Sequence, residues 1–168
     1  MKKLKGIDGK LDLAWSKLVK LRANMKCEIE GCKHKPTLNS HHIFSRKNKS
    51  TRWDVENGIC LCVGHHTMSS KFSAHGNPIA FTYWLEEYKG SDWIDELSQK
   101  AHSIRKWHKF EKEELLQELL KQIKELESQL DNKLSKFQEE LKEKDEEKKQ
   151  LADKNELLKK QIELLQAQ

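Results

Sequence analysis

After Gly90 the chain contains no further glycine and no proline, so a long α-helix is the structure favoured for its last third. From Leu116 onward, apolar residues recur every seven positions, which is the repeat of a coiled coil. One series consists of Leu116, Ile123, Leu130, Phe137, Lys144, Leu151, Leu158 and Leu165, and the second of Leu119, Leu126, Leu134, Leu141, Lys148, Asn155 and Ile162. The offset between the two series changes from three to four residues near Leu130, and this stutter predicts local unwinding of the supercoil.

We expect residues 116–165 to form a parallel homodimeric coiled coil. Asn155 falls on an a position, where a buried asparagine fixes a parallel two-stranded register at some cost in stability. Lys144 and Lys148 make the predicted contact between the two helices polar, and therefore weak, in its middle. A single charged helix held by Glu–Lys pairs four residues apart is the alternative. The acidic surface of the segment also offers a docking face for a protein partner.

Charge divides the chain near Lys109. Residues 1–109 contain 20 Lys and Arg against 11 Asp and Glu, a net charge of +9, whereas residues 110–168 contain 12 Lys against 16 Asp and Glu, a net charge of −4. The first part also contains every His, Cys, Trp, Gly and Pro of the chain. A compact basic module suggests a polyanionic partner such as nucleic acid, and a solvated basic surface is the alternative.

The chain has no stretch approaching 18 uninterrupted apolar residues, so we expect no membrane-spanning helix and no membrane partner. The basic start is not followed by an apolar segment of the kind found in signal peptides, so we expect a cytoplasmic protein. In a reducing compartment, four cysteines are interpreted as metal ligands before disulfides.

The cysteines form two pairs, each of the kind that contributes to zinc sites. Cys27 and Cys32 are separated by four residues, and Cys60, Cys62 and His65 follow about thirty residues later. Two such knuckles facing each other make a tetrahedral Zn²⁺ site. The expected ligands are Cys27, Cys32, Cys62 and His65. Cys60 points the same way as Cys62 on a strand, so Cys60 is either the replacement ligand or a small buried hydrophobe.

Local patterns predict the elements around these pairs. An amphipathic helix over residues 10–24 packs on the core, two strands cover 40–44 and 58–62, and a helix starts near His65. Asn77-Pro78 begins a further helix that Gly90 ends, and Ser91 caps the next one. The expected divisions are residues 1–26 for the N-terminal helix, 27–109 for the core with its helical extension, and 110–168 for the coiled coil.

Histidines lie between the two zinc knuckles and directly after them. His41 and His42 lie on a predicted strand and therefore face opposite sides of the sheet, so the two side chains cannot have the same role. Asn57 and His66 follow, the latter next to His65. This pattern resembles the HNH motif of the His-Me finger endonucleases, in its zinc-containing form common in bacteriophages and their hosts. The resemblance covers roughly residues 12–102 and leaves the predicted coil outside it.

The resemblance implies an α+β fold, with a small zinc-stapled ββα-metal HNH core, flanking helices and the long C-terminal coiled coil. It also implies roles for single residues: His42 as the general base, His41 and His66 as ligands of one divalent cation, and Asn57 as the residue that orients the base. The catalytic cation would be Mg²⁺, Mn²⁺, Ni²⁺ or Zn²⁺.

This sequence departs from the family in two places. A histidine stands at position 65 where many members have a second cysteine, so His65 and His66 are open to exchange roles. Some relatives carry a further metal-binding histidine four residues after the last one, where this chain has Ser70. His75 is the nearest substitute, with a loop or capping role as the alternative.

Four basic residues crowd the loop between His42 and Asn57: Arg46, Lys47, Lys49 and Arg52. We expect at least one of them to contact phosphate, Arg46 or Arg52 ahead of the lysines because of bidentate geometry, and a solvated loop is the alternative. Trp53 at the end of the loop is expected in the core. The expected function is hydrolysis of DNA phosphodiester bonds by a metal-dependent endonuclease. A non-catalytic zinc-stapled DNA-binding or scaffold module and an RNA-cleaving nuclease remain the alternatives.

Overall fold

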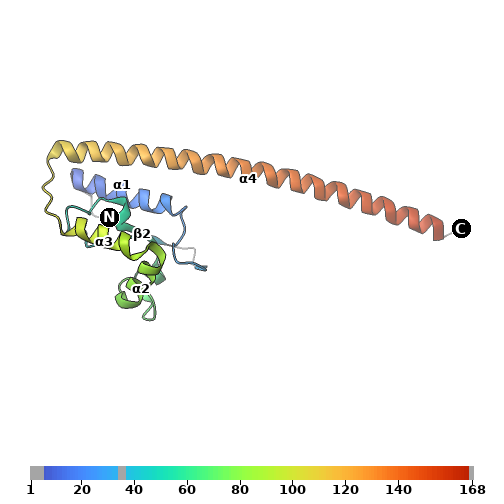
Figure 1. Ribbon diagram of the computed structural model, residues 1–168. Helices are drawn as coiled ribbons and strands as arrows, with labels where there is room; N and C mark the ends of the chain where they lie inside the picture. The colour runs from blue at the N-terminus through green and yellow to red at the C-terminus, as the bar shows by residue number, and fades with distance from the viewer. Residues whose placement is uncertain (1–5, 34–36, 167–168) are drawn as a thin grey trace. The chain divides into compact units, whose positions relative to one another are not determined.

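The computed structural model describes residues 6–33 and 37–166, so the first five residues of the expected N-terminal segment and the last two of the expected coil lie outside the description. The described chain is a mixed α+β fold with a small sheet and a long C-terminal helix, as expected (Figure 1). Its elements are α1 (Ile7–Arg22), β1 (Leu38–His42), η1 (Val55–Asn57), β2 (Gly58–Cys62), η2 (Gly64–Met68), α2 (Pro78–Lys89), α3 (Ser91–His102) and α4 (Lys109–Gln166). The chain divides into two compact units, Met1–Glu127 and Ser128–Gln168.

The sheet of the first unit consists of β1 and β2, paired antiparallel with Ser40 opposite Cys60 and His42 opposite Gly58. One face of this sheet is covered by α1. Ser16 on α1 shares a 3.0 Å hydrogen bond with the hydroxyl of Ser40. A Cβ at Gly58 would lie 2.3 Å from the Cγ2 of Val19, so only glycine permits this close approach of helix and strand.

The opposite face of the sheet carries a hydrophobic core cluster, and β2 lies between α1 and α2 in Figure 1. The buried members of this core are Ile59, Leu61, Ala74, Phe81 and Leu85. Because side chains alternate along a strand, Ile59 and Leu61 point into this core while Gly58 faces α1. Adjacent residues of β1 therefore enter two different environments.

Several local predictions are confirmed and others need correction. Asn77 caps α2, since its Oδ1 accepts a hydrogen bond from the Ala80 amide at 3.2 Å, and the helix ends before Gly90. Ser91 is not the cap of α3: it is the first helical residue, and Gly90, at a φ of +89°, occupies the cap position. The expected helix near His65 is a single turn of five residues.

The first strand lies two residues earlier than predicted, at 38–42 instead of 40–44. The reason is a competing set of hydrogen bonds from Asn57. Its main-chain oxygen accepts from the Ile43 amide at 3.0 Å, and its side-chain oxygen accepts from the Phe44 amide at 2.7 Å. Side-chain capture of a backbone amide ends the ladder and turns the chain into the loop.

The first part of α4 belongs to the first unit, contrary to an intermolecular coil that starts at Leu116. Leu119 and Ile123 are only 2% and 4% exposed, although each belongs to the heptad series predicted to contact a second chain. Lys112 donates to Asp8 of α1 at 2.7 Å, and Lys17 of α1 pairs with Glu127 at 2.7 Å. The heptad pattern indicates only that one face of the helix is buried. In this first part of α4, that face is buried against other residues of the same chain. Among the described helices, none is long and apolar enough to cross a membrane.

Candidate functional site

Four predicted zinc ligands, Cys27, Cys32, Cys62 and His65, lie together at one end of the sheet. The Sγ atoms of Cys32 and Cys62 are 3.8 Å apart, and His65 Nδ1 lies 3.4 Å from the Sγ of both Cys27 and Cys62. A tetrahedral Zn²⁺ with its usual bond lengths requires sulfur–sulfur separations of about 3.8 Å and sulfur–nitrogen separations of about 3.5 Å. The donor set and its spacing therefore fit a structural zinc ion.

The two knuckles meet because the chain after α1 is hydrogen-bonded to β2. The Glu28 amide donates to the Cys60 carbonyl at 2.9 Å, and the Glu28 carboxylate accepts from the Cys60 amide at 2.7 Å. Cys60 is itself fully buried and is not one of the four clustered ligands. Burial raises the pKa of the Cys60 thiol to about 11, so at neutral pH it is a small uncharged hydrophobe.

A second cluster brings together His41, His66 and His75, whose nearest ring nitrogens all lie within 4.8 Å of one another. His41 comes from β1, His66 from η2 and His75 from the turn before α2. The main chain fixes this turn, because the His75 amide donates to the His66 carbonyl at 3.0 Å. Sequence reasoning left His75 between a metal and a loop role, and the structure places it beside the other two.

The surroundings of His41 and His66 favour neutral imidazoles. Burial, together with the neighbouring His66 and His75, lowers the pKa of His41 to about 3. Burial likewise lowers the pKa of His66, with His75 adding to the effect. Metals bind imidazole through an unprotonated nitrogen, so His41 and His66 are in their ligating form at neutral pH. Three imidazole nitrogens without a carboxylate suit Mn²⁺, Ni²⁺ or Zn²⁺ better than Mg²⁺.

His42 points to the other face of the sheet, as alternation along the strand requires. Its ring stacks on Trp15 of α1, with centroids 3.7 Å apart and planes at 15°. Its Nε2 lies 2.9 Å from the Arg52 carbonyl oxygen, which only accepts, so Nε2 carries the proton and Nδ1 keeps its lone pair. Burial lowers the pKa of His42, so the ring is neutral at pH 7 and able to accept a proton at Nδ1.

Asn57 is fully buried and holds the loop that connects His42 to η1. Its Nδ2 donates to the Phe44 carbonyl at 2.9 Å and to the Thr51 carbonyl at 3.0 Å, while its Oδ1 accepts from the Phe44 amide. One amide side chain thus ties together both ends of the loop. The carbonyl that contacts His42 belongs to the next residue, Arg52, so the position of the His42 ring depends on this tie.

A carboxylate on α1 holds the side chain of Arg52, the residue whose carbonyl contacts His42. Asp12 accepts from Arg52 Nε at 3.0 Å and from its terminal nitrogen at 2.8 Å, and it also accepts from the indole of Trp53 at 2.7 Å. Trp53 is buried, as expected. The fork of the Arg52 guanidinium is engaged by Asp12, which leaves Arg46, Lys47 and Lys49 as the exposed cations of the loop.

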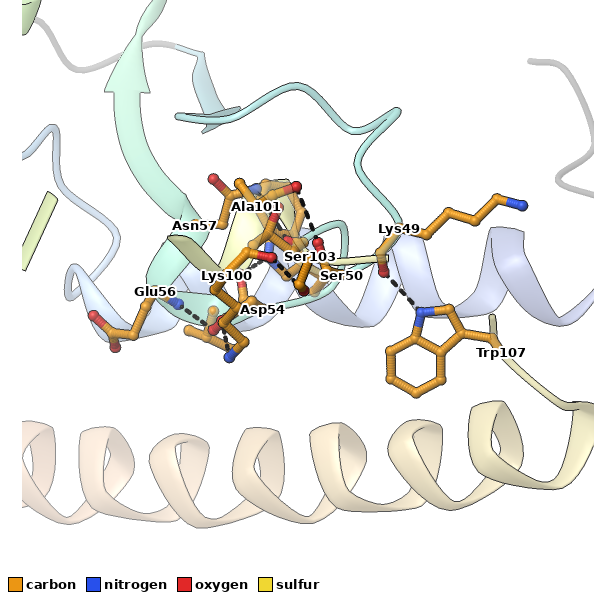
Figure 2. Close-up of polar contacts among 12 residues, drawn as sticks. Lys49, Ser50, Asp54, Glu56, Asn57, Lys100, Ala101, Ser103 and Trp107 are labelled. Atoms are coloured by element: carbon orange, nitrogen blue, oxygen red, sulfur yellow. Dashed lines mark hydrogen bonds and ion pairs between the residues drawn. The ribbon is translucent and has the colours of Figure 1, made fainter. Parts of the chain in front are cut away.

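The far side of the loop is braced by α3 and the segment before α4, as Figure 2 shows. Ser50 donates to the Ala101 carbonyl at 3.3 Å, and the Trp107 indole donates to the Lys49 carbonyl at 2.7 Å. Lys100 pairs with Asp54, whose other oxygen caps η1 through the Glu56 amide. These contacts make the loop a rigid part of the unit.

Sequence reasoning missed Asp12 and assigned Trp15 only to a helix face. No local pattern identifies either role, because their partners are between 27 and 41 residues away in the chain. The opposite orientation of His41 and His42, by contrast, follows directly from strand alternation.

Comparison with known proteins finds no match for this chain, whether among family models, curated proteins or solved structures.

Proposed function

We propose that this chain is a metal-dependent endonuclease of the HNH type that hydrolyses DNA phosphodiester bonds. The observation that supports the proposal is that two adjacent histidines of β1 lie in different environments on opposite faces of the sheet. His41 joins a three-histidine cluster on one face, and the next residue, His42, is a neutral, oriented base on the other. The antiparallel hairpin and the helical turn that carries His66 also agree with the ββα arrangement that the sequence resemblance implies.

His42 acts as the general base in this proposal. The Arg52 carbonyl holds the proton on Nε2, and the Trp15 ring fixes the plane of the imidazole. Nδ1 then takes a proton from a water molecule as that water attacks the phosphorus. Asn57 and Asp12 are positioning residues: Asn57 binds the Thr51 carbonyl, and Asp12 binds the side chain of Arg52, whose carbonyl contacts His42.

His41, His66 and His75 would hold the catalytic cation, with water and phosphate oxygens completing its coordination. When bound, the cation supplies charge neutralisation at the scissile phosphate and at the leaving oxygen. His75 takes the place of the histidine that some HNH relatives carry four residues after the motif. His65 belongs to the zinc cluster by position and His66 to the three-histidine cluster, which supports the original assignment of the two neighbours.

DNA is the proposed substrate because the loop beside His42 carries exposed cations. Arg46, Lys47 and Lys49 are exposed, and phosphate contacts position a nucleic acid without reading its sequence. Arg52 contributes less, since its guanidinium is paired with Asp12 at 2.8 Å.

The test is cleavage of supercoiled plasmid by zinc-loaded protein in the presence of EDTA, Mg²⁺, Mn²⁺ or Ni²⁺. We expect nicking with Mn²⁺ or Ni²⁺, and a loss of about a hundredfold or more in His42→Ala, the usual contribution of a general base. His108→Ala is the matched control, because this exposed histidine lies outside both clusters.

Cleavage by His42→Ala at the wild-type rate contradicts the assignment of the base. A protein that binds DNA without cutting it in any metal is a binding module, and one that cuts only an RNA substrate of the same sequence is a ribonuclease.

A further inference from the structure

The second unit, Ser128–Gln168, leaves an apolar stripe uncovered among its described residues. The stripe, here called the seam, has eleven positions: Leu130, Leu134, Phe137, Leu141, Lys144, Lys148, Leu151, Asn155, Leu158, Ile162 and Leu165. Eight of these are apolar, and side chains such as Phe137, Leu151 and Leu165 are 56%, 60% and 72% exposed. At 1.5 Å per residue the seam is about 50 Å long, which is far longer than a scattered surface leucine would explain.

The stutter lies where the apolar face of α4 changes from buried to exposed. Before it, Leu119 and Ile123 are buried within the first unit. After it, the two series of apolar residues continue at a shifted offset, and the unit boundary falls at Glu127, three residues before Leu130. The apolar pattern in the second unit is therefore independent of packing in the first unit. Burial of this stripe requires a binding partner.

A lone charged helix does not account for the second unit. Such helices depend on many Glu–Lys pairs four residues apart. Such pairs, of which Lys160 with Glu156 at 2.8 Å is one, stabilise a helix without requiring an apolar stripe, so they leave the eight apolar seam residues unexplained. We propose that the seam binds the seam of a second copy of this chain, in a parallel, in-register, two-stranded coiled coil.

The polar residues of the seam identify the occupant. In a parallel pair each a residue packs beside the a residue of the other helix and its preceding g residue, and each d residue packs beside the following e residue. Asn155 at a then meets Asn155 of the second copy, and the two amides bond to each other. A parallel register shifted by one heptad would separate the two amides, placing one Asn155 beside Ile162 and the other beside Lys148.

The two seam lysines are satisfied by the same arrangement. Lys148 at a lies beside Glu147 of the second copy, and Lys144 at d lies beside Asp145 of the second copy. The weak middle of the seam thus supplies its own counter-charges only when the partner carries this sequence in this register. Like-charged neighbours remain in this arrangement. Lys144 and Lys148 each face their own copies across the seam. Two further like-charged pairs, Lys154 with Lys159 and Glu140 with Asp145 of the second copy, lie at exposed flanking positions, where salt screens them.

Neighbouring leucines allow a matched test by light scattering of the full zinc-loaded chain across a range of concentrations. Leu158 lies on the seam and is 45% exposed, whereas Leu157 lies off it and is 59% exposed. We expect wild type at twice the chain mass of 19.8 kDa, Leu157→Glu unchanged, and Leu158→Glu with a dissociation constant raised about a hundredfold or more. Equal behaviour of the two variants, or a wild type that stays monomeric at every concentration, overturns the proposal.

A charge exchange tests the register. Lys148→Glu places two carboxylates together across the interface and weakens the dimer, and adding Glu147→Lys restores the pair. Adjacent residues on one helix do not face each other, so rescue reports a contact between chains. Absence of rescue, or a trimer or tetramer, contradicts the parallel two-stranded arrangement. Because neither readout is cleavage, this proposal can fail while the nuclease assignment stands, and the reverse.

Discussion

Replacing Asn57 with alanine removes the tie that closes the loop beside His42. Asn57 makes three side-chain hydrogen bonds, two with Phe44 and one with Thr51, in a fully buried position. At about 1 kcal/mol for each bond between neutral groups, the variant loses about 3 kcal/mol of unfolding free energy. For a unit of this size that corresponds to a fall of about 10 °C in Tm.

The assay is thermal unfolding of zinc-loaded protein followed by circular dichroism, with hydrogen exchange at the Phe44 amide as the local readout. That amide bonds to the Asn57 side chain, so its protection should drop by more than the change in global stability explains. Asn132→Ala is the control, since Asn132 is exposed in the second unit. A Tm within about 2 °C of wild type, together with unchanged protection at Phe44, would refute the reasoning.

Three further predictions concern the frame of the site. Gly58→Ala should destabilise the first unit by about 2 kcal/mol through overpacking, since its Cβ would lie 2.3 Å from Val19; denaturant unfolding that is unchanged would contradict this. Cys62→Ala should lose the structural zinc, whereas Cys60→Ala should retain it, as metal analysis by mass spectrometry would show. Burial raises the pKa of Asp12, but hydrogen bonds from its basic and indole partners outweigh burial and the net pKa lies below 3.8. Its stabilising contribution is thus complete above that value and is lost as pH falls through the folded-state pKa. The stability difference between wild type and Asp12→Asn should therefore shrink between about pH 5 and pH 2, and a constant difference would exclude the ion pair as its source.

Local patterns in the sequence were enough for several features. Gly90 and the Asn77-Pro78 pair set helix ends because backbone freedom and capping are properties of a few neighbouring residues. The zinc ligands could be chosen from spacing, because two short knuckles bring their own sulfur atoms together. Cys60 remained an alternative to Cys62, since both lie on the same strand with the same alternation, and the structure confirms Cys62 as the clustered residue.

The two strands show where local reasoning stops. The predicted bounds of β2 match the structure, in which all five of its residues are buried. β1 was predicted two residues too late. The shift comes from Asn57, whose side chain takes the Phe44 amide out of the ladder. A residue thirteen positions away leaves no trace in the pattern of the strand itself.

What the sequence determined by itself is the set of short-range features: helix ends, strand alternation that separates His41 from His42, the pairing of zinc ligands, and the long helix without glycine or proline. What only the tertiary structure decided is which distant side chains meet. Packing of α1 on the sheet places Trp15 against His42 and Asp12 against Arg52. The turn before α2 places His75 beside His41 and His66, and packing within the first unit buries Leu119 and Ile123. Heptads and strand patterns specify that a face is buried, because burial depends on side-chain type, but the identity of the surface that covers it depends on how the whole chain packs.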